Sequence, residues 1–244
     1  MKKRVLGEAA DMNDKPMTAI VEFQVNTETT SVEEWLEEWS KRAEDARVGE
    51  PQTPSYAAAI NSEVDNNILV FERYSQGDSS LKEHLNRTAH GELHKRMGDK
   101  NMTKRRVMGT RFTDVEGYGW WSRPDQEDVM MRPGVILTVL GMRFPSEQQR
   151  EKFIQLSQAH ADYCWTEEPD TLIYSGGLAL SDADRELDIK AGDLIFVMAS
   201  TDMEAMVKHR DDPKHVAIGE RLSADGINVE GTFLRSYETT GDGY

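Results

Sequence analysis

The feature that most constrains this chain is an internal repeat. Residues 50–56 and residues 168–174 both read E-P-x-T-x-x-Y, at an offset of 118 positions (168 − 50). The same offset places Trp35 on Phe153, within what reads as the same helix pattern. A repeat unit longer than about 50 residues is a duplicated domain rather than one turn of a solenoid. The 244 residues therefore predict two copies of one domain, each of about a hundred residues, which is enough to bury a core.

A pair of histidines extends the repeat toward the end of each half. His84 and His90 match His209 and His215 at an offset of 125 (209 − 84), so both halves carry H-x5-H. The larger offset indicates an insertion in the second half, and residues 181–189 fit it as a longer middle loop. The expected boundaries are a disordered lead at 1–16, a first domain at 17–113, a linker at 114–133 and a second domain at 134–244.

The sequence pattern predicts the same order of strands and helices in each half. In the first half, alternating residues over 18–25 predict a strand, and an apolar stripe that begins after Thr30 or Ser31 and ends at Gly49 predicts a helix. Further strands are expected at 56–60, 68–74 and 102–112, with a second helix at 79–97 that is interrupted near Asn86. The order βαββαβ is the ferredoxin-like unit. The second half repeats it with strands at 135–143, 172–180, 194–200 and 228–237, and with helices at 147–164, at 203–210 and after Pro213.

The fold class expected from this pattern is α+β. A four-stranded sheet with both helices on one side leaves an apolar face that must be covered. Two tandem ferredoxin-like domains solve this within one chain by packing sheet to sheet, as a pseudo-dimeric α+β barrel, with a further homodimer left open.

Composition excludes several classes of partner. Lys+Arg number 29 against 44 Asp+Glu, a formal net charge of −15, which repels phosphate backbones and anionic membranes. We therefore expect no nucleic-acid partner. The chain has no apolar run long enough to span a membrane, and its single cysteine, Cys164, fits a reducing compartment. The expected location is cytoplasmic.

These motifs together resemble the antibiotic biosynthesis monooxygenase family, whose members are dimeric α+β barrel proteins. The matching pattern is V-E-F-x-V at 21–25, a tryptophan-bearing helix, the Glu50-Pro51 turn that leads to Tyr56, the segment F-E-R-Y at 71–74, and the His84 and His90 pair. The second half departs from this pattern, because Met198 and Ser200 stand where the first half has Glu72 and Tyr74. The first half is therefore expected to hold the working pocket, and the second half to act as scaffold.

The resemblance implies a monooxygenase of secondary metabolism that needs no cofactor. Its substrate would be a phenolic, polycyclic anthrone-like or quinol-like small aromatic molecule, which reacts with O2 after it has lost a proton. The protein must then supply a base, hydrogen-bond donors and an apolar pocket.

The candidate site residues follow from this demand. His84, Glu72 and Tyr74 are the candidate catalytic groups, with His84 as the preferred base because histidine titrates near neutral pH. Each residue also has a purely structural interpretation. His84 could be a structural histidine bonded to a loop carbonyl, and Glu72 could form an ion pair with Arg73 or Arg106. The candidate substrate-binding residues are Trp35, Trp39, Tyr56 and His90, although aromatic residues at helical spacing more often belong to a core.

No bound metal or flavin is expected from the sequence. H-x5-H is not the i,i+4 spacing of two ligands on one helix face, and there is no glycine-rich phosphate-binding loop. Two other functions stay open: a non-catalytic protein that binds a small molecule, and a haem-binding or haem-degrading protein of the same fold, with His84, His90 or His209 as the ligand.

Overall fold

A computed structural model describes residues 14–126 and 129–244. Most of the expected disordered lead therefore lies outside the described residues. The first half contains β1 (Met17–Val25), α1 (Val32–Gly49), β2 (Ser55–Asn61), β3 (Asn67–Tyr74), α2 (Gly77–Asn86), α3 (Thr88–Asp99) and β4 (Thr103–Trp120). The second half contains β5 (Ile136–Arg143), α4 (Glu147–Glu167), β6 (Thr171–Ala179), β7 (Asp184–Arg185), β8 (Leu194–Ser200), α5 (Met203–Asp211), α6 (Pro213–Ala224) and β9 (Glu230–Gly243).

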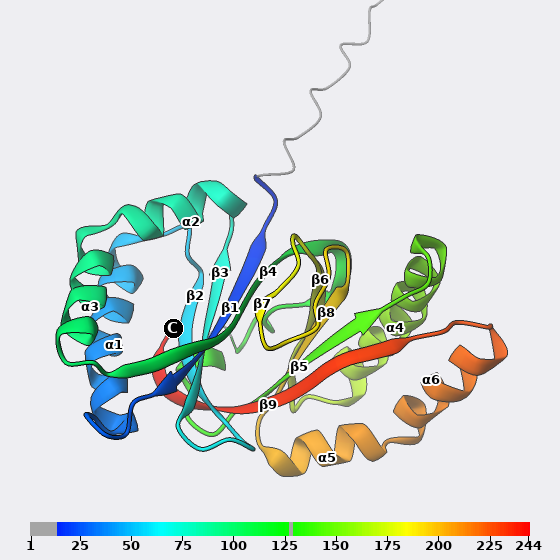
Figure 1. The fold of residues 1–244 in the computed structure, drawn as a ribbon. Coiled ribbons are helices and arrows are strands. Elements are labelled where there is room, and N and C mark those ends of the chain that lie inside the picture. The colour runs from blue at the N-terminus through cyan, green and yellow to red at the C-terminus, as the bar shows by residue number, and fades with distance from the viewer. Residues whose placement is uncertain (1–13, 127–128) are drawn as a thin grey trace, which may run out of the picture.

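The strands close into one antiparallel barrel of eight strands. Their order is β1-β3-β2-β9-β5-β8-β6-β4, and pairing of β4 with β1 closes the ring. Two seams join the halves: β2 pairs with β9, and β4 pairs with β6. Helices α1–α3 lie outside the barrel on one side and α4–α6 on the other (Figure 1). The expected α+β pseudo-dimer is thus confirmed, with the two sheets joined edge to edge as well as facing each other.

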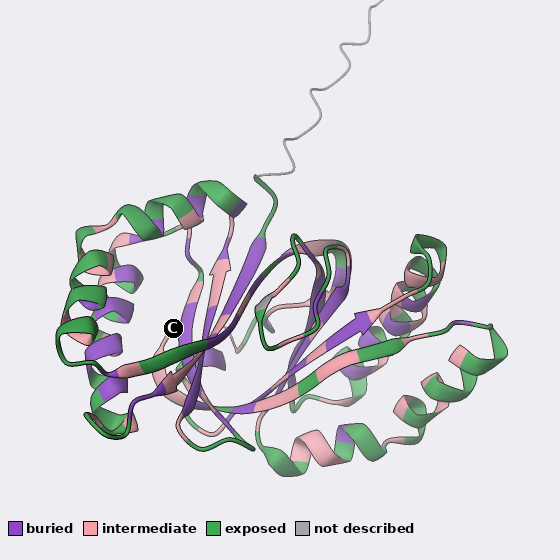
Figure 2. Cartoon of the chain, viewed as in Figure 1, coloured by how far each residue is buried: buried purple, intermediate pink, exposed green. Residues whose placement is uncertain are grey.

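Closure of the barrel changes the environment of β1. Its alternating pattern is that of a strand with one solvent face, but the polar residues Thr18 and Glu22 are fully buried (0 % exposed). Glu22 accepts hydrogen bonds from Asn67 Nδ2 at 2.8 Å and from Tyr237 Oη at 3.1 Å. The alternating pattern alone predicts a half-buried strand, and this interpretation is wrong for the polar side of β1, because the face that would be polar in an open sheet points into a closed barrel. Figure 2 shows the buried residues concentrated along the strands and the inner sides of the helices.

The segment expected as a linker begins as strand. β4 continues from Thr103 to Trp120, past the predicted end at 112, and pairs with β6 on both sides of an irregularity between Asp114 and Gly119. Trp121 then packs against the barrel core, with the guanidinium of Arg73 3.7 Å from the centre of its ring. The division into domains at 113 and 134 stays a prediction.

The helix ends follow the sequence signals. Ser31 caps α1: its Oγ accepts from the Glu34 amide at 3.1 Å, while the Glu34 carboxylate accepts from the Ser31 amide at 3.0 Å. This reciprocal capping box satisfies two amide groups that have no partner within the helix. The interruption near Asn86 is confirmed, because α2 ends there and α3 begins at Thr88. Within the described chain, none of the helices has the length and apolar character needed to span a membrane.

Candidate functional site

A cavity of about 570 Å³ lies between the outer face of the first-half sheet and helices α1–α3. It is separate from the barrel interior, because the sheet side chains on its wall alternate with those that point into the barrel core. Much of the wall is apolar, and the wall also includes Glu72, His90, His94 and Arg106. Of the predicted site residues, the lining includes Trp35, Trp39, Tyr56, Glu72 and His90.

Glu72 is the carboxylate that the sheet directs to this cavity. It is half-buried on β3, and the Tyr74 hydroxyl donates a hydrogen bond to its Oε2 at 2.5 Å. Burial raises the pKa of Glu72 above its ordinary value, although the charge of His84 and the Tyr74 hydrogen bond act in the opposite direction. Its carboxyl group is therefore a stronger base than an exposed glutamate once ionised.

Two aromatic residues form part of the wall beside Glu72. Trp39 lies on α1 and donates its indole N–H to the Tyr56 hydroxyl at 3.0 Å, with the rings 4.8 Å apart. Burial raises the pKa of Tyr56 far above its ordinary value, so the phenol stays protonated. Both line the cavity, and they also belong to the first-half core.

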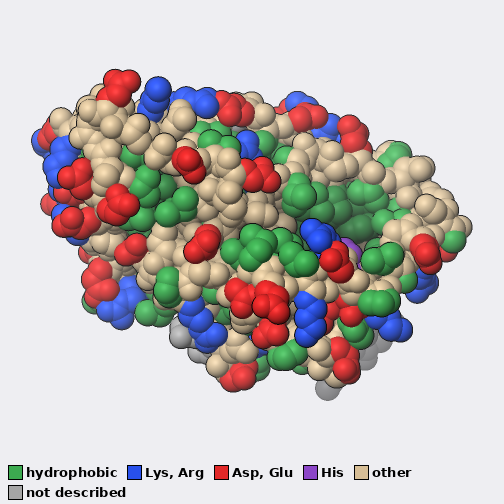
Figure 3. All heavy atoms as spheres, turned by 90° about the horizontal axis from the view of Figure 1, so that it is seen from below, with side chains coloured by type: hydrophobic (Ala, Val, Ile, Leu, Met, Phe, Trp, Pro, Cys, Tyr) green, Lys and Arg blue, Asp and Glu red, His purple; other side chains and the backbone are tan. Residues whose placement is uncertain are grey.

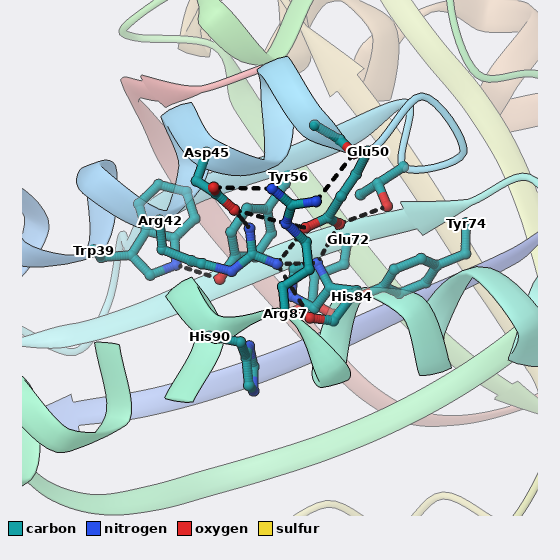
Figure 4. A network of polar contacts seen from close by, with 12 residues as sticks. Trp39, Arg42, Asp45, Glu50, Tyr56, Glu72, Tyr74, His84, Arg87 and His90 are labelled. Atoms are coloured by element: carbon teal, nitrogen blue, oxygen red, sulfur yellow. Dashed lines mark hydrogen bonds and ion pairs between the residues drawn. The ribbon is translucent and has the colours of Figure 1, made fainter. Parts of the chain in front are cut away.

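His84 lies behind this wall and not on it. Its ring packs against Tyr56, with centroids 4.9 Å apart, and against Tyr74, with centroids 5.7 Å apart. Its Nδ1 is 2.8 Å from Oε2 of Glu50 (Figure 4). The preferred assignment of His84 as the base therefore conflicts with its position, because Glu72 reaches the cavity and His84 reaches it only through its neighbours.

A buried ion-pair network holds His84. Arg42 is fully buried (0 % exposed); its guanidinium contacts the Glu50 carboxylate and also lies 2.9 Å from Nδ1 of His84. Burial alone would raise the pKa of Glu50, but His84 and Arg42 outweigh it and hold that pKa at about 2. Arg87 completes the network through Asp45, with Nε 2.8 Å from Oδ2 (Figure 4). The network fixes the back of the cavity wall.

Two members of this site were not predicted from the sequence. Arg42 falls three positions after Trp39 on the apolar stripe of α1, and a charge at a buried stripe position is the signal that could have found it. His94 lies one turn after His90 on α3, and their Nε2 atoms are 3.0 Å apart. This i,i+4 spacing was readable from the sequence. Burial, helped by the charges of His94 and His84, lowers the pKa of His90 to about 4, so that its ring is neutral at pH 7.

The corresponding region of the second half is filled with aromatic side chains. The Ser157 hydroxyl, at the position of Trp39, lies 2.7 Å from the Tyr118 hydroxyl and 2.9 Å from that of Tyr174. Tyr118 reaches this region from β4 and packs on Phe196. Met198, at the position of Glu72, is 5 % exposed. An apolar side chain at this sheet position supports packing without the cost of a buried carboxylate.

On the face shown in Figure 3, acidic and basic side chains are interspersed with apolar ones. This distribution agrees with the net negative charge and shows no continuous basic stripe on that face.

Comparison with solved structures identifies the fold. No protein-family model and no curated protein sequence matches the chain. The structure is similar to that of a candidate monooxygenase from Lactobacillus acidophilus, with a TM-score of 0.68 and 11 % identity over 94 % of this chain and 98 % of the other. An anthrone oxidase-like protein matches 95 % of this chain and 94 % of its own at 13 % identity, with a TM-score of 0.53. A candidate chlorite dismutase matches over 94 % and 96 % at 10 % identity, with a TM-score of 0.57.

These likenesses cover both halves and the way in which the halves are joined. The chain therefore has the same tandem α+β barrel fold as these proteins. At 10 to 13 % identity the likeness concerns the fold alone, and the activity depends on the residues of the site.

Proposed function

We propose that the first half contains the active site of a cofactor-independent monooxygenase. The substrate class is a phenolic, polycyclic anthrone-like or quinol-like aromatic molecule. The observation that supports this most is the placement of Glu72, a half-buried carboxylate whose pKa is raised, on the wall of a mainly apolar cavity of about 570 Å³. An apolar cavity with a few placed polar groups is typical of a small-molecule site.

In this mechanism, Glu72 begins the reaction as the base. Its carboxylate takes a proton from the activated C–H or O–H of the substrate, and the aromatic anion gives one electron to O2. The resulting radical pair combines to form a C–O bond, which gives a peroxide anion. Glu72 returns its proton to the outer oxygen as a hydroperoxide forms. Loss of water from an anthrone hydroperoxide breaks the O–O bond and leaves a quinone, so that one oxygen atom enters the product and the other leaves as water.

The neighbours of Glu72 favour this role. The Tyr74 hydroxyl hydrogen-bonds to the carboxylate at 2.5 Å and fixes its direction. Trp35 and Trp39 offer flat apolar faces to an aromatic substrate. His84, Glu50 and Arg42 hold Tyr56 and Tyr74 from behind, and we assign them to positioning.

Oxygen uptake tests the proposal. The purified chain, assayed with anthrone and with a hydroquinone, should consume one O2 per substrate molecule, and ¹⁸O2 should label the product with one atom. Glu72→Gln should reduce turnover by roughly 10²-fold or more, as expected for loss of a general base. Glu238→Gln, on β9 and away from the cavity lining, serves as the matched control. Binding of the same molecules without oxygen uptake would favour the alternative of a non-catalytic binding protein.

Haem binding is the second candidate, and His90 and His94 on the cavity wall are the observation that favours it. Either ring could offer an axial nitrogen, but their Nε2 atoms now contact each other at 3.0 Å, so that ligation requires this contact to break. Titration with haem should give a Soret band that His90→Ala and His94→Ala abolish if this function is correct. No shift of the haem spectrum on addition of the protein would exclude it.

A further inference from the structure

Three histidines from three helices meet in the second half. His160 lies on α4, His209 on α5 and His215 on α6. One ring nitrogen from each lies within 4.8 Å of the others, and the ring centroids are 4.7 to 5.4 Å apart. His160 and His209 are buried, at 5 % and 4 % exposed. His215 is half-buried, so the three imidazoles converge at a largely buried place.

Two nitrogen atoms of this cluster lack a protein partner. Nε2 of His160 and Nδ1 of His215 are inaccessible to solvent and have no hydrogen-bond partner among the described residues. A buried polar atom without a partner costs stability. In a neutral imidazole such a nitrogen carries either a proton or a lone pair, and a lone pair in this position can bind a metal ion.

The third imidazole is oriented by a carboxylate. Nδ1 of His209 is 2.7 Å from Oε2 of Glu168, and the Thr171 hydroxyl donates to the same oxygen at 3.0 Å. If Nδ1 donates its proton to Glu168, the lone pair of His209 is on Nε2. A carboxylate behind the metal-ligating histidine is the usual outer-shell arrangement in metalloproteins.

The second half has a histidine where the first half has a buried arginine. His160 stands at the position of Arg42, at the offset of 118 that relates the two first helices. In the first half the Arg42 guanidinium contacts the Glu50 carboxylate. In the second half an imidazole replaces that permanent cation, and Oε1 of Glu168 has no hydrogen-bond partner among the described residues. A bound cation would restore the positive charge that the first half draws from arginine.

We propose that His160, His209 and His215 form a binding site for a divalent transition-metal ion, with Zn²⁺ as the best match. Neutral imidazoles suit Zn²⁺, Co²⁺, Ni²⁺ and Cu²⁺, whereas Mg²⁺ and Ca²⁺ prefer oxygen ligands. Zn–N bonds of about 2.1 Å in a tetrahedral site hold the nitrogens about 3.4 Å apart. Side-chain rotations that bring the rings together by roughly 1 Å complete this geometry, and water takes the fourth position.

This site differs from the sequence expectation of no metal. That expectation rested on the H-x5-H spacing, which puts His209 and His215 on two different helices. The fold supplies the third ligand from α4, 49 positions before His209 in the chain. A metal ion here would join α4 to α5 and α6 and would therefore have a structural role.

A neighbouring cluster offers a rival arrangement. Cys164, Glu168 and His209 also bring one ligand atom each within 4.8 Å of one another, and Cys164 Sγ is 3.8 Å from Nδ1 of His209. Burial, Glu168 and Asp212 raise the pKa of the Cys164 thiol far above its ordinary value, and a metal at this place would break the contact between His209 and Glu168. The two arrangements predict different spectra, because a thiolate ligand gives an intense near-ultraviolet charge-transfer band with Co²⁺.

The test is a metal titration of the full chain after treatment with a chelator. Co²⁺ should give the visible absorption of a four-coordinate site without the thiolate band. One equivalent of Zn²⁺ should displace the Co²⁺, and the dissociation constant for Zn²⁺ should be on the order of 1 µM or tighter. His160→Arg and His215→Ala should each weaken binding by about 100-fold or more. His160→Arg is the stronger variant, because it installs the side chain that the first half already accommodates at Arg42, and His160→Gln replaces it should the arginine variant not fold.

Two controls separate this site from other metal ligands. His94→Ala removes the His90–His94 pair in the first half and should leave the one-equivalent binding unchanged, and Cys164→Ala should do the same. Zn²⁺ should raise the melting temperature of the wild type and leave that of His160→Arg unchanged. The proposal is overturned if the wild type binds neither Co²⁺ nor Zn²⁺ in this range, or if Cys164→Ala or His94→Ala abolishes binding while His160→Arg does not.

Discussion

The Tyr74 hydroxyl donates to Oε2 of Glu72 across 2.5 Å, from two positions further along the same strand. Alternation along β3 puts both side chains on the outer face of the sheet. Glu72 then reaches the cavity, whereas Tyr74 is buried beside His84. A buried phenol thereby adjusts the proton affinity of a carboxylate that lines the cavity.

The first prediction concerns that adjustment. The hydrogen bond from Tyr74 lowers the pKa of Glu72, against the larger effect of burial, which raises it. Tyr74→Phe removes the hydrogen bond and should raise the pKa of Glu72 further. Because the ionised form is the base, kcat/KM falls as the pH drops through this pKa, and the midpoint of the acid limb should move to higher pH in the variant. An unchanged midpoint would show that Glu72 does not control the acid limb.

The second prediction compares matched histidines in the two halves. His84 and His209 are each buried and paired with a glutamate, at 2.8 Å and 2.7 Å. In metal-free protein, replacement of either by alanine should lower the free energy of unfolding by a similar amount, about 2 kcal/mol. Only His84→Ala should lower turnover, on the order of tenfold, because it disturbs Tyr56 and Tyr74. Equal losses of turnover in protein of equal stability would mean that activity is not confined to the first half.

The fold was largely predictable from the sequence, because it follows from constraints that act along the whole chain. A duplicated βαββαβ order leaves two uncovered sheet faces, and their mutual burial gives the barrel. The seams that close the barrel were not predictable. They form because β4 runs on to Trp120 and β9 to Gly243. The lengths of these strands and the register in which they pair depend on tertiary structure.

The site was predictable only in part. Apolar periodicity placed Trp35 and Trp39 on the buried face of α1, where the structure has them, and strand alternation placed Glu72 and Tyr74 on one face. Periodicity alone does not tell which side of the wall a buried polar residue occupies, so His84 was expected at the cavity and is found behind it. The long side chain of Arg42 reaches Glu50 and His84 from within an apolar stripe, a contact that depends on tertiary structure.

The third prediction concerns acid stability. The pKa of Glu50 is held at about 2, below its ordinary value of 4.5, by His84 and Arg42 against the effect of burial. A carboxylate whose pKa is lowered on folding contributes stability above the unfolded pKa, and this contribution is lost as the pH falls toward the folded pKa. The shift corresponds to about 3 kcal/mol, lost between pH 4.5 and about pH 2. Glu50→Gln should flatten the pH dependence in this window, as measured by urea unfolding.

A matched variant in the second half tests whether the buried Arg42 makes the loss of the Glu50 charge costly. Glu50→Gln removes the buried carboxylate that contacts the fully buried Arg42 and leaves it paired with Asp45, whose Oδ2 lies 3.1 Å from the guanidinium. Loss of the buried partner should cost about 3 kcal/mol at neutral pH. Glu168→Gln removes the corresponding carboxylate where the arginine is replaced by His160, and should cost less, about 1 kcal/mol. A larger loss for Glu168→Gln would contradict the assignment of Arg42 as the partner that makes Glu50 costly to neutralise.

The last prediction asks whether the cavity is where the substrate binds. Gly109 lies on β4 and lines the cavity. A Cβ atom built at this position has its nearest neighbours, the Arg106 guanidinium and the Ile20 carbonyl oxygen, at 4.0 Å, so that a side chain fits without a backbone clash. Gly109→Phe should therefore fill part of the cavity in a protein that stays folded, since the strand has room for it and aromatic residues favour strands.

The expected result is a rise in the apparent KM of roughly tenfold or more with aromatic substrates, while the melting temperature changes little. Gly231→Phe, on β9 with no atom within 4 Å of its Cβ position, is the matched control, because it adds the same side chain to a strand away from the cavity. Binding of an aromatic ligand, followed by quenching of tryptophan fluorescence, should weaken in Gly109→Phe and not in Gly231→Phe. Full activity and unchanged ligand affinity in a folded Gly109→Phe variant would place the substrate site elsewhere. That result would also contradict the roles proposed for Glu72 and Tyr74.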